Sequence, residues 1–188
     1  QARDAAWGDV EANLQRRLRV EGMRADVDPD YDVMRGARMQ ALRARTLEDE
    51  HAAKFFQMLG AAERPLIYAG GGVIHSDGAE ELRAFAHEFG IPVVTTLMGI
   101  GTYDTTEPLA LHMLGMHGAA FANYAVDDCD FLIAIGARFD DRVAAVPDKF
   151  APKALKIAHF DIDPCEIGKV KAADWHNVGL LDRDLRQL

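Results

Sequence analysis

The sequence predicts an α/β fold in three layers (α/β/α), with a mainly parallel sheet of about six strands between two layers of helices. Two observations carry this prediction. Short apolar runs typical of buried strands recur along the chain, and segments with apolar residues at helical spacing separate them. Hydrophobic residues make up 49% of the 188 residues, which is enough for the large core that such a fold requires.

The regular pattern begins at Thr46, which together with Asp49 resembles a helix capping box. Apolar residues at helical spacing follow, and Pro65 ends this first helix. Two more helices are expected over residues 78–89, closed by a cap at Gly90, and over residues 118–126. The expected strands cover residues 66–69, 91–96, 131–135 and 156–160. Strands that alternate with helices at this spacing favour a parallel, Rossmann-like sheet.

Residues 1–45 differ from the rest of the chain. They are rich in arginine and poor in β-branched residues, with a weak helical pattern around residues 9–18 and a turn expected at Pro29. This composition predicts an N-terminal arm or interdomain linker over residues 1–45, followed by one α/β domain over residues 46–188.

Net charge, apolar runs and cysteines indicate which partners and which compartment the protein has. The formal net charge of −9 argues against a nucleic-acid partner, and the apolar runs are too short to span a membrane. Cys129 and Cys165 stand alone, without metal-ligand spacing, so we interpret both as buried free thiols of a reducing compartment. These features predict a cytoplasmic protein.

Loops that follow parallel strands meet at one edge of a sheet, where such folds bind ligands. The longest candidate loop covers residues 136–143, in which Arg138, Asp140, Asp141 and Arg142 crowd together after an apolar run. Paired guanidinium donors suit phosphate or carboxylate groups. The alternative is a solvated loop held by its own ion pairs.

Three other loops share this edge: residues 70–72, 95–98 and 161–163. The glycines at 70–72 either form a turn or let the backbone approach a ligand, but with His75 they do not complete a dinucleotide-binding fingerprint. We expect Asp161 to face a ribose and Asp163 to cap a helix that starts near Pro164.

One further segment, residues 114–118, precedes a helix and offers main-chain amides to an anion. No nucleophile–base pair and no cluster of metal ligands is visible in the sequence. The loops therefore predict a site that holds a long, phosphate-bearing ligand and performs no chemistry of its own.

Five segments in order along the chain carry a resemblance to one family. They are residues 65–72, 90–101, 113–124, 138–143 and 160–169. With them, residues 64–171 closely resemble the central domain of the catalytic large subunit of acetohydroxyacid synthase, also called acetolactate synthase.

The resemblance implies a piece of a larger enzyme that depends on thiamine diphosphate and Mg²⁺. That family joins two pyruvates, or pyruvate and 2-ketobutyrate, with loss of CO₂, in branched-chain amino-acid synthesis. Its central domain binds FAD, which undergoes no net redox change. An N-terminal pyrimidine-binding domain and a C-terminal diphosphate-binding domain would carry the catalytic groups, so no catalytic residue and no metal ligand is expected in this chain. The implied partners are those domains, a second copy of the enzyme and a regulatory small subunit.

The resemblance also implies which residues would contact FAD. They are Gly70, Gly71, Gly72, Thr96, Leu97, Met98, Leu114, Gly115, Met116, His117, Gly136, Ala137, Arg138, Asp140, Arg142, Val143, Asp161 and Ile162. Met116, Asp141 and Arg142 would also line the channel that leads to the thiamine cofactor. The chain departs from the family pattern at residues 16–22 and 178–182, so no contact is carried over there.

Three expectations follow for function. The chain would be inactive alone and would retain little or no flavin, because neighbouring domains also hold the cofactor. Another thiamine-dependent carboligase, similar to glyoxylate carboligase, is an alternative source of the same domain. A nucleotide-binding module that stands alone is the alternative from a different class.

Overall fold

The structure is a computed structural model that describes residues 29–188, so the pattern at residues 9–18 and the departure at residues 16–22 lie outside the described part. The chain divides after Ala44 into two units, and each is described by itself. The described part of the first unit is the helix α2, Pro29–Ala44. The turn expected at Pro29 is wrong, because a proline that lacks an N–H and has a fixed φ is well suited to the first turn of a helix.

The second unit is built on one six-stranded sheet in which every pair of neighbours is parallel. The strands are β1 (Pro65–Ala69), β2 (Val93–Thr95), β3 (Ala110–Met113), β4 (Phe131–Ile135), β5 (Lys156–Asp161) and β6 (Trp175–Val178). Their order across the sheet is β3-β2-β1-β4-β5-β6. The fold class predicted from the sequence is confirmed, although the two edge strands, β3 and β6, were not located.

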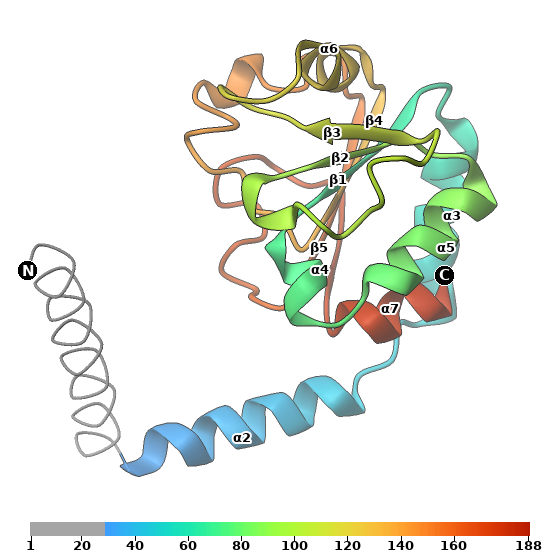
Figure 1. The fold of residues 1–188 in the computed structure, drawn as a ribbon. Coiled ribbons are helices and arrows are strands. Elements are labelled where there is room, and N and C mark those ends of the chain that lie inside the picture. The colour runs from blue at the N-terminus through green and yellow to red at the C-terminus, as the bar shows by residue number, and fades with distance from the viewer. Residues whose placement is uncertain (1–28) are drawn as a thin grey trace, which may run out of the picture. The chain divides into compact units, whose positions relative to one another are not determined.

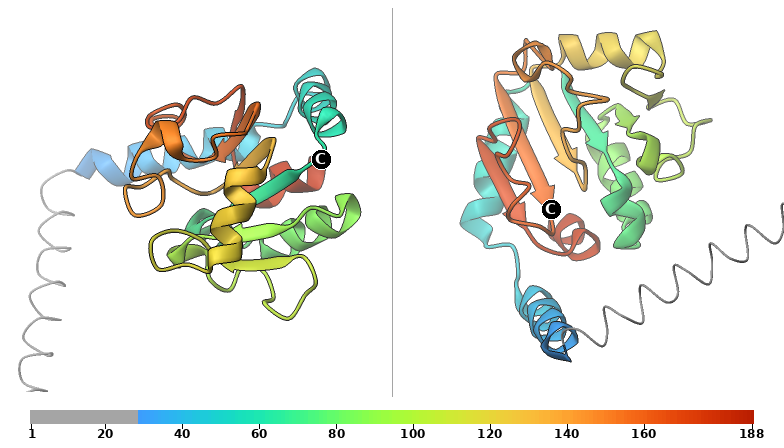
Figure 2. Two further views of the ribbon diagram at one scale, coloured as in Figure 1. Left: turned by 90° about the horizontal axis from the view of Figure 1, so that it is seen from above. Right: turned by 90° about the vertical axis from the view of Figure 1, so that its left-hand side faces the viewer.

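Helices cover both faces of the sheet (Figures 1 and 2). The helices are α3 (Asp49–Ala61), α4 (Gly71–His75), α5 (Ala79–Phe89), α6 (Ala120–Asp128) and α7 (Leu181–Gln187), with short 3₁₀ turns at Leu97–Gly99 and Pro147–Lys149. On β1, Ile67 and Ala69 face a core shared with α3, α4, α5 and α7, whereas Leu66 and Tyr68 face a core shared with α6 and residues 137–151. The alternation of side chains along each strand thus produces the three layers.

Two local predictions about helix starts are wrong. Helix α3 begins at Asp49 with Glu48 as its N-cap, so Thr46 lies outside it and forms no capping box. Acidic side chains in the first turn, Asp49 and Glu50, take the place of the cap by facing the positive end of the helix dipole. No helix begins near Pro164; turns follow Asp163 instead.

The prediction of a cap at Gly90 is confirmed, because this glycine has the left-handed φ of 63° and its N–H bonds back to the last turn of α5.

The two cysteines differ in exposure. Cys129 is buried as expected, but Cys165 is exposed on the turn after Asp163, so the prediction of two buried thiols is wrong for Cys165. None of the helices among the described residues is long and apolar enough to cross a bilayer.

The backbones that follow β1 and β4 lie in close contact at the carboxyl ends of these paired strands. A Cβ atom on Gly72 would lie 2.7 Å from Gly136 Cα, and one on Gly70 would overlap the Gly136 carbonyl oxygen. Gly136 itself has a φ of 56°, which favours glycine. The glycines were expected to serve ligand approach; Gly70 and Gly72 are first required by this contact between the two backbones.

Candidate functional site

The candidate site lies where the chain changes direction in building the sheet. After β1 the chain moves outward to β2 and β3, and it then returns to place β4 on the other side of β1. The loops after β1 and β4 therefore leave the sheet in opposite directions and open a crevice between them, which is where doubly wound sheets bind nucleotide ligands.

A cleft of about 520 Å³ occupies this position. The residues that line it are Tyr68, Gly70, Gly71, Gly72, His75, Thr96, Leu97, Met98, Gly136, Ala137, Arg138, Asp140, Asp141, Arg142, Val143, Asp161, Asp163 and Glu166. All four loops that the sequence places at this edge contribute to it. The volume is within the range of about 300–1,000 Å³ that is usual for sites of small molecules and cofactors.

The loop after β4 supplies the positive charge of the cleft. Arg138 and Arg142 are both exposed, and the ion pair of Arg142 with Asp141 is long, at 3.9 Å, between side chains that are 78% and 86% exposed. Such a pair contributes little and releases the guanidinium group easily. Both arginines can therefore meet an anionic ligand in the cleft.

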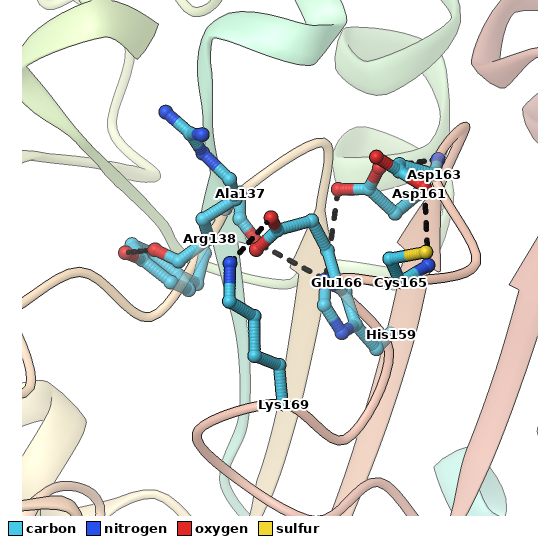
Figure 3. A network of polar contacts seen from close by, with 9 residues as sticks. Ala137, Arg138, His159, Asp161, Asp163, Cys165, Glu166 and Lys169 are labelled. Carbon is cyan, nitrogen blue, oxygen red and sulfur yellow. Dashed lines mark hydrogen bonds and ion pairs between the residues drawn. The ribbon is translucent and has the colours of Figure 1, made fainter.

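The loop after β5 supplies carboxylates. Asp161 is almost buried and accepts a hydrogen bond of 2.8 Å from the N–H of Asp163. Burial raises the pKa of Asp161, while the N–H of Asp163 and the nearby His159 oppose this shift. Figure 3 shows Arg138 pointing away from Asp161 and Asp163, which come from the loop after β5.

Asp163 has a different role from the expected one. It caps no helix; instead its Oδ1 atom accepts a hydrogen bond of 3.1 Å from the N–H of Cys165 in a turn, and it lines the cleft. Close by, Lys169 donates a hydrogen bond of 2.9 Å to Glu166, which also lines the cleft (Figure 3).

The structure leaves some of the expected contact residues outside the lining of the cleft. These are Leu114, Gly115, Met116, His117 and Ile162. The loop of residues 114–117 still touches residues 136–143, called the arginine loop from here on, since the Met116 N–H donates a hydrogen bond of 3.3 Å to the Arg142 carbonyl oxygen. Of the three residues expected at a substrate channel, Asp141 and Arg142 line the cleft and Met116 does not.

The sequence did not identify four residues of the cleft lining: Tyr68, His75, Asp163 and Glu166. Asp163 was expected to cap a helix instead. Tyr68 lies inside a predicted strand, where an aromatic residue is ordinary core. Strand alternation alone indicates only that Tyr68 lies on the face of the sheet opposite to Ile67 and Ala69.

The groups that line the cleft are suited to binding a ligand. It offers two guanidinium groups, carboxylates and main-chain groups, which suit a ligand with both phosphate and hydroxyl groups. In the described part of the chain, no three histidine, cysteine or acidic side chains gather to hold a metal ion.

Comparison of the chain with known proteins identifies a family. Residues 52–188 match the family described as thiamine pyrophosphate enzyme, central domain. The acetolactate synthase large subunit of Parasynechococcus marenigrum is 48% identical over 140 residues, which cover 74% of this chain and 22% of that protein. The large subunit from Corynebacterium glutamicum is 51% identical over 138 residues, 72% of this chain and 22% of the relative.

A third relative, the probable acetolactate synthase large subunit of Methanocaldococcus jannaschii, is 54% identical over 142 residues, 76% of this chain and 23% of its own length. The match thus spans less than a quarter of these relatives. The six-stranded parallel sheet and the family match over residues 52–188 agree, and the chain belongs to the family of thiamine pyrophosphate enzyme central domains.

Proposed function

We propose that this chain is the FAD-binding central domain of an acetolactate synthase large subunit. The observation that carries the proposal is the convergence of four loops on one cleft at the β1–β4 crevice, with two arginines in the loop after β4 and the carboxylates of Asp161 and Asp163 in the loop after β5. Identity of about half of the aligned residues to proteins named acetolactate synthase supports the choice of enzyme.

The residues of the cleft fit FAD, a dinucleotide with a diphosphate between two hydroxyl-bearing chains. Arg138 and Arg142 would bind the diphosphate through charge-assisted hydrogen bonds. Asp161, held at a strand end by the N–H of Asp163, would accept hydrogen bonds from ribose hydroxyls. Leu97 and Met98, both 69% exposed, would cover the apolar flavin ring.

In this role the chain binds and orients, and it moves no proton or electron. Bound FAD would supply a rigid surface beside the thiamine site and no net redox chemistry. Thiamine diphosphate and Mg²⁺ would be held by the remaining domains of the same polypeptide. The whole enzyme would join two pyruvates, or pyruvate and 2-ketobutyrate, with release of CO₂, as a homo-oligomer with a regulatory small subunit. A cytoplasmic location stays a prediction.

The alternatives are less well supported. The relatives named above are acetolactate synthases, which disfavours a carboligase similar to glyoxylate carboligase. They are also more than four times longer than their matched segments, which disfavours a nucleotide-binding module that stands alone.

The test uses the full-length polypeptide that contains this chain, stripped of cofactors. We expect acetolactate to form from pyruvate only when thiamine diphosphate, Mg²⁺ and FAD are all restored. Consumption of glyoxylate in place of pyruvate would support the other carboligase, and full activity without FAD would contradict the role of the cleft. The 188-residue chain alone should be inactive and should lose flavin on gel filtration; a stoichiometric flavin spectrum after that step would contradict this expectation.

A further inference from the structure

Two buried side chains of the sheet make hydrogen bonds to the backbone of the arginine loop. The Tyr68 hydroxyl, on β1, donates a hydrogen bond of 2.8 Å to the carbonyl oxygen of Arg138. The His159 ring, on β5, makes a hydrogen bond of 3.0 Å through Nε2 to the carbonyl oxygen of Ala137. Both side chains have an exposed fraction of 0%, and their strands flank β4, from which the loop emerges.

The hydrogen-bond partner of His159 determines which ring nitrogen carries the hydrogen. A carbonyl oxygen only accepts, so Nε2 carries the hydrogen and Nδ1 is the unprotonated nitrogen. Burial lowers the pKa of His159, which keeps the ring neutral. Nδ1 has no hydrogen-bond partner among the described residues.

An unsatisfied nitrogen in a core costs free energy that an apolar side chain would avoid. His159 lies in the middle of a strand whose neighbours Ala158 and Phe160 are fully buried, so packing alone gives no reason for a polar residue. His159 makes two polar contacts that a leucine would lack: the hydrogen bond to Ala137, and an approach of Nε2 to within 3.8 Å of Asp161 Oδ2, which is too long for a hydrogen bond.

Phe139 completes the arrangement. Its side chain is buried, and its ring lies 5.7 Å from the Tyr68 ring and 5.3 Å, edge to face, from the His159 ring. Phe139 therefore points into the core while Arg138, the residue before it, points out into the cleft. Figure 3 shows the Arg138 side chain and the His159 ring on opposite sides of the backbone at Ala137.

The Arg138 guanidinium group has no hydrogen bond or ion pair with any of the described residues. The described residues therefore hold Arg138 through its backbone, which sets the direction in which the side chain leaves Cα. Because the carbonyl groups of Ala137 and Arg138 are both held, the peptide planes on the two sides of Arg138 Cα are fixed.

We propose that Tyr68 and His159 are positioning residues, which bind no ligand through these hydrogen bonds but aim Arg138 at an anionic group in the cleft. This inference rests on the proposed function, since it takes the anion to be the diphosphate of FAD. It adds that affinity for the cofactor depends on two side chains in the core of the sheet.

The experiment measures the Kd of FAD for the full-length polypeptide by flavin fluorescence, with thermal unfolding measured in parallel. Tyr68→Phe removes one hydroxyl group and keeps the ring, and it should weaken FAD binding about three- to tenfold. His159→Leu should have a similar effect, and His159→Gln, whose amide can donate to Ala137, should restore most of the affinity. Tyr103→Phe is the matched control, because Tyr103 is a buried tyrosine whose hydroxyl contacts His87 and which does not line the cleft.

A double-mutant cycle separates positioning from general stability. In an Arg138→Ala background, Tyr68→Phe should cause no further loss of FAD affinity, whatever it does to the melting temperature; the cycle uses Tyr68 because His159 also lies 3.8 Å from Asp161. The same three- to tenfold loss in that background would overturn the inference, and so would unchanged affinity of Tyr68→Phe. Failure of the wild-type polypeptide to bind FAD would instead refute the proposed function, so the two failures are distinct.

Discussion

The side-chain amide of Asn123 brackets the backbone of Gly115. Its Oδ1 atom accepts a hydrogen bond of 2.8 Å from the Gly115 N–H, and its Nδ2 atom donates one of 3.1 Å to the Gly115 carbonyl oxygen. The next residue, Met116, donates to the Arg142 carbonyl oxygen. A residue of α6 thereby connects the loop of residues 114–118 to the arginine loop of the cleft.

We predict that Asn123→Ala lowers the free energy of unfolding by about 1–3 kcal/mol, because both polar groups of Gly115 lose a half-buried partner. Asn123→Asp is the informative control. It keeps the acceptor for the Gly115 N–H but sets a carboxylate against the carbonyl oxygen. Urea unfolding of the three proteins measures the effect, and equal stability of Asn123→Ala and wild type would show that the bracket contributes nothing.

Two glycines provide a matched test of the contact between the backbones that follow β1 and β4. Gly72→Ala would force a Cβ atom to within 2.7 Å of Gly136 Cα, which costs about 1–3 kcal/mol or more as the two backbones separate. Gly60→Ala makes the same chemical change inside α3, where no atom beyond the adjacent residues and the helix's own backbone lies within 4 Å of the added Cβ. It should stabilise the protein by roughly 0.5–1 kcal/mol. Thermal unfolding should show opposite signs, and equal signs would contradict the contact described here.

Asp184 makes the stability depend on pH. It is buried on α7 against Gly179, its Oδ2 atom has no partner among the described residues, and burial raises its pKa to about 6. The unfolded carboxyl group ionises near pH 3.9. Between these values the folded state binds more protons, so its stability falls as pH rises through about 4 to 6.

Asp184→Asn should remove this dependence and stabilise the protein at pH 7 by about 2–3 kcal/mol relative to wild type, with little difference at pH 4. Asp127→Asn, an exposed position on α6, is the control for loss of one charge. The measurement is the free energy of unfolding at several pH values. A constant difference between Asp184→Asn and wild type from pH 4 to 7 would refute the assignment.

The two thiols should react at very different rates. Cys165 is exposed, whereas Cys129 is buried and burial raises its pKa to about 12. The thiolate is the reactive form, so a thiol reagent at pH 8 should modify one cysteine rapidly and the second only on unfolding. Cys165→Ser should abolish the fast phase. Two equivalents of fast reaction in the native protein would contradict the burial of Cys129.

The central strands were predictable because their sequences are unambiguous. In β4, all five residues are buried, and a continuous apolar run of this length between charged residues is typical of a parallel strand covered on both faces. The loops of the cleft followed from these strands, since a parallel sheet brings their carboxyl ends together. This is why four loops could be assigned to one edge without any coordinates.

The edge strands could not be recognised in the same way. The short β3 contains His112 with a φ of 59° and an irregular register against β2, and β6 carries His176 and Asn177 in a run of four residues. Such sequences lack a continuous apolar pattern, and pairing with the neighbouring strand decides their conformation.

Two residues of the cleft lining beyond the strand ends, His75 and Glu166, could not be predicted from the sequence. Packing of α4 against the arginine loop brings His75 to the cleft, and the turn after Asp163 brings Glu166 there, although no local pattern marks either residue. Ile162 does not line the cleft, because β5 ends at Asp161 and the chain bends at residue 162.

The central claim is that the arginine loop grips FAD, and one titration tests it most directly. Arg138→Ala should weaken FAD binding to the full-length polypeptide by roughly ten- to a hundredfold, which corresponds to about 1.5–3 kcal/mol for a lost charged hydrogen bond. Arg64→Ala removes the same charge from an exposed residue that precedes β1, at the opposite edge of the sheet, and should leave the affinity unchanged. Equal affinity of wild type and Arg138→Ala would contradict the account.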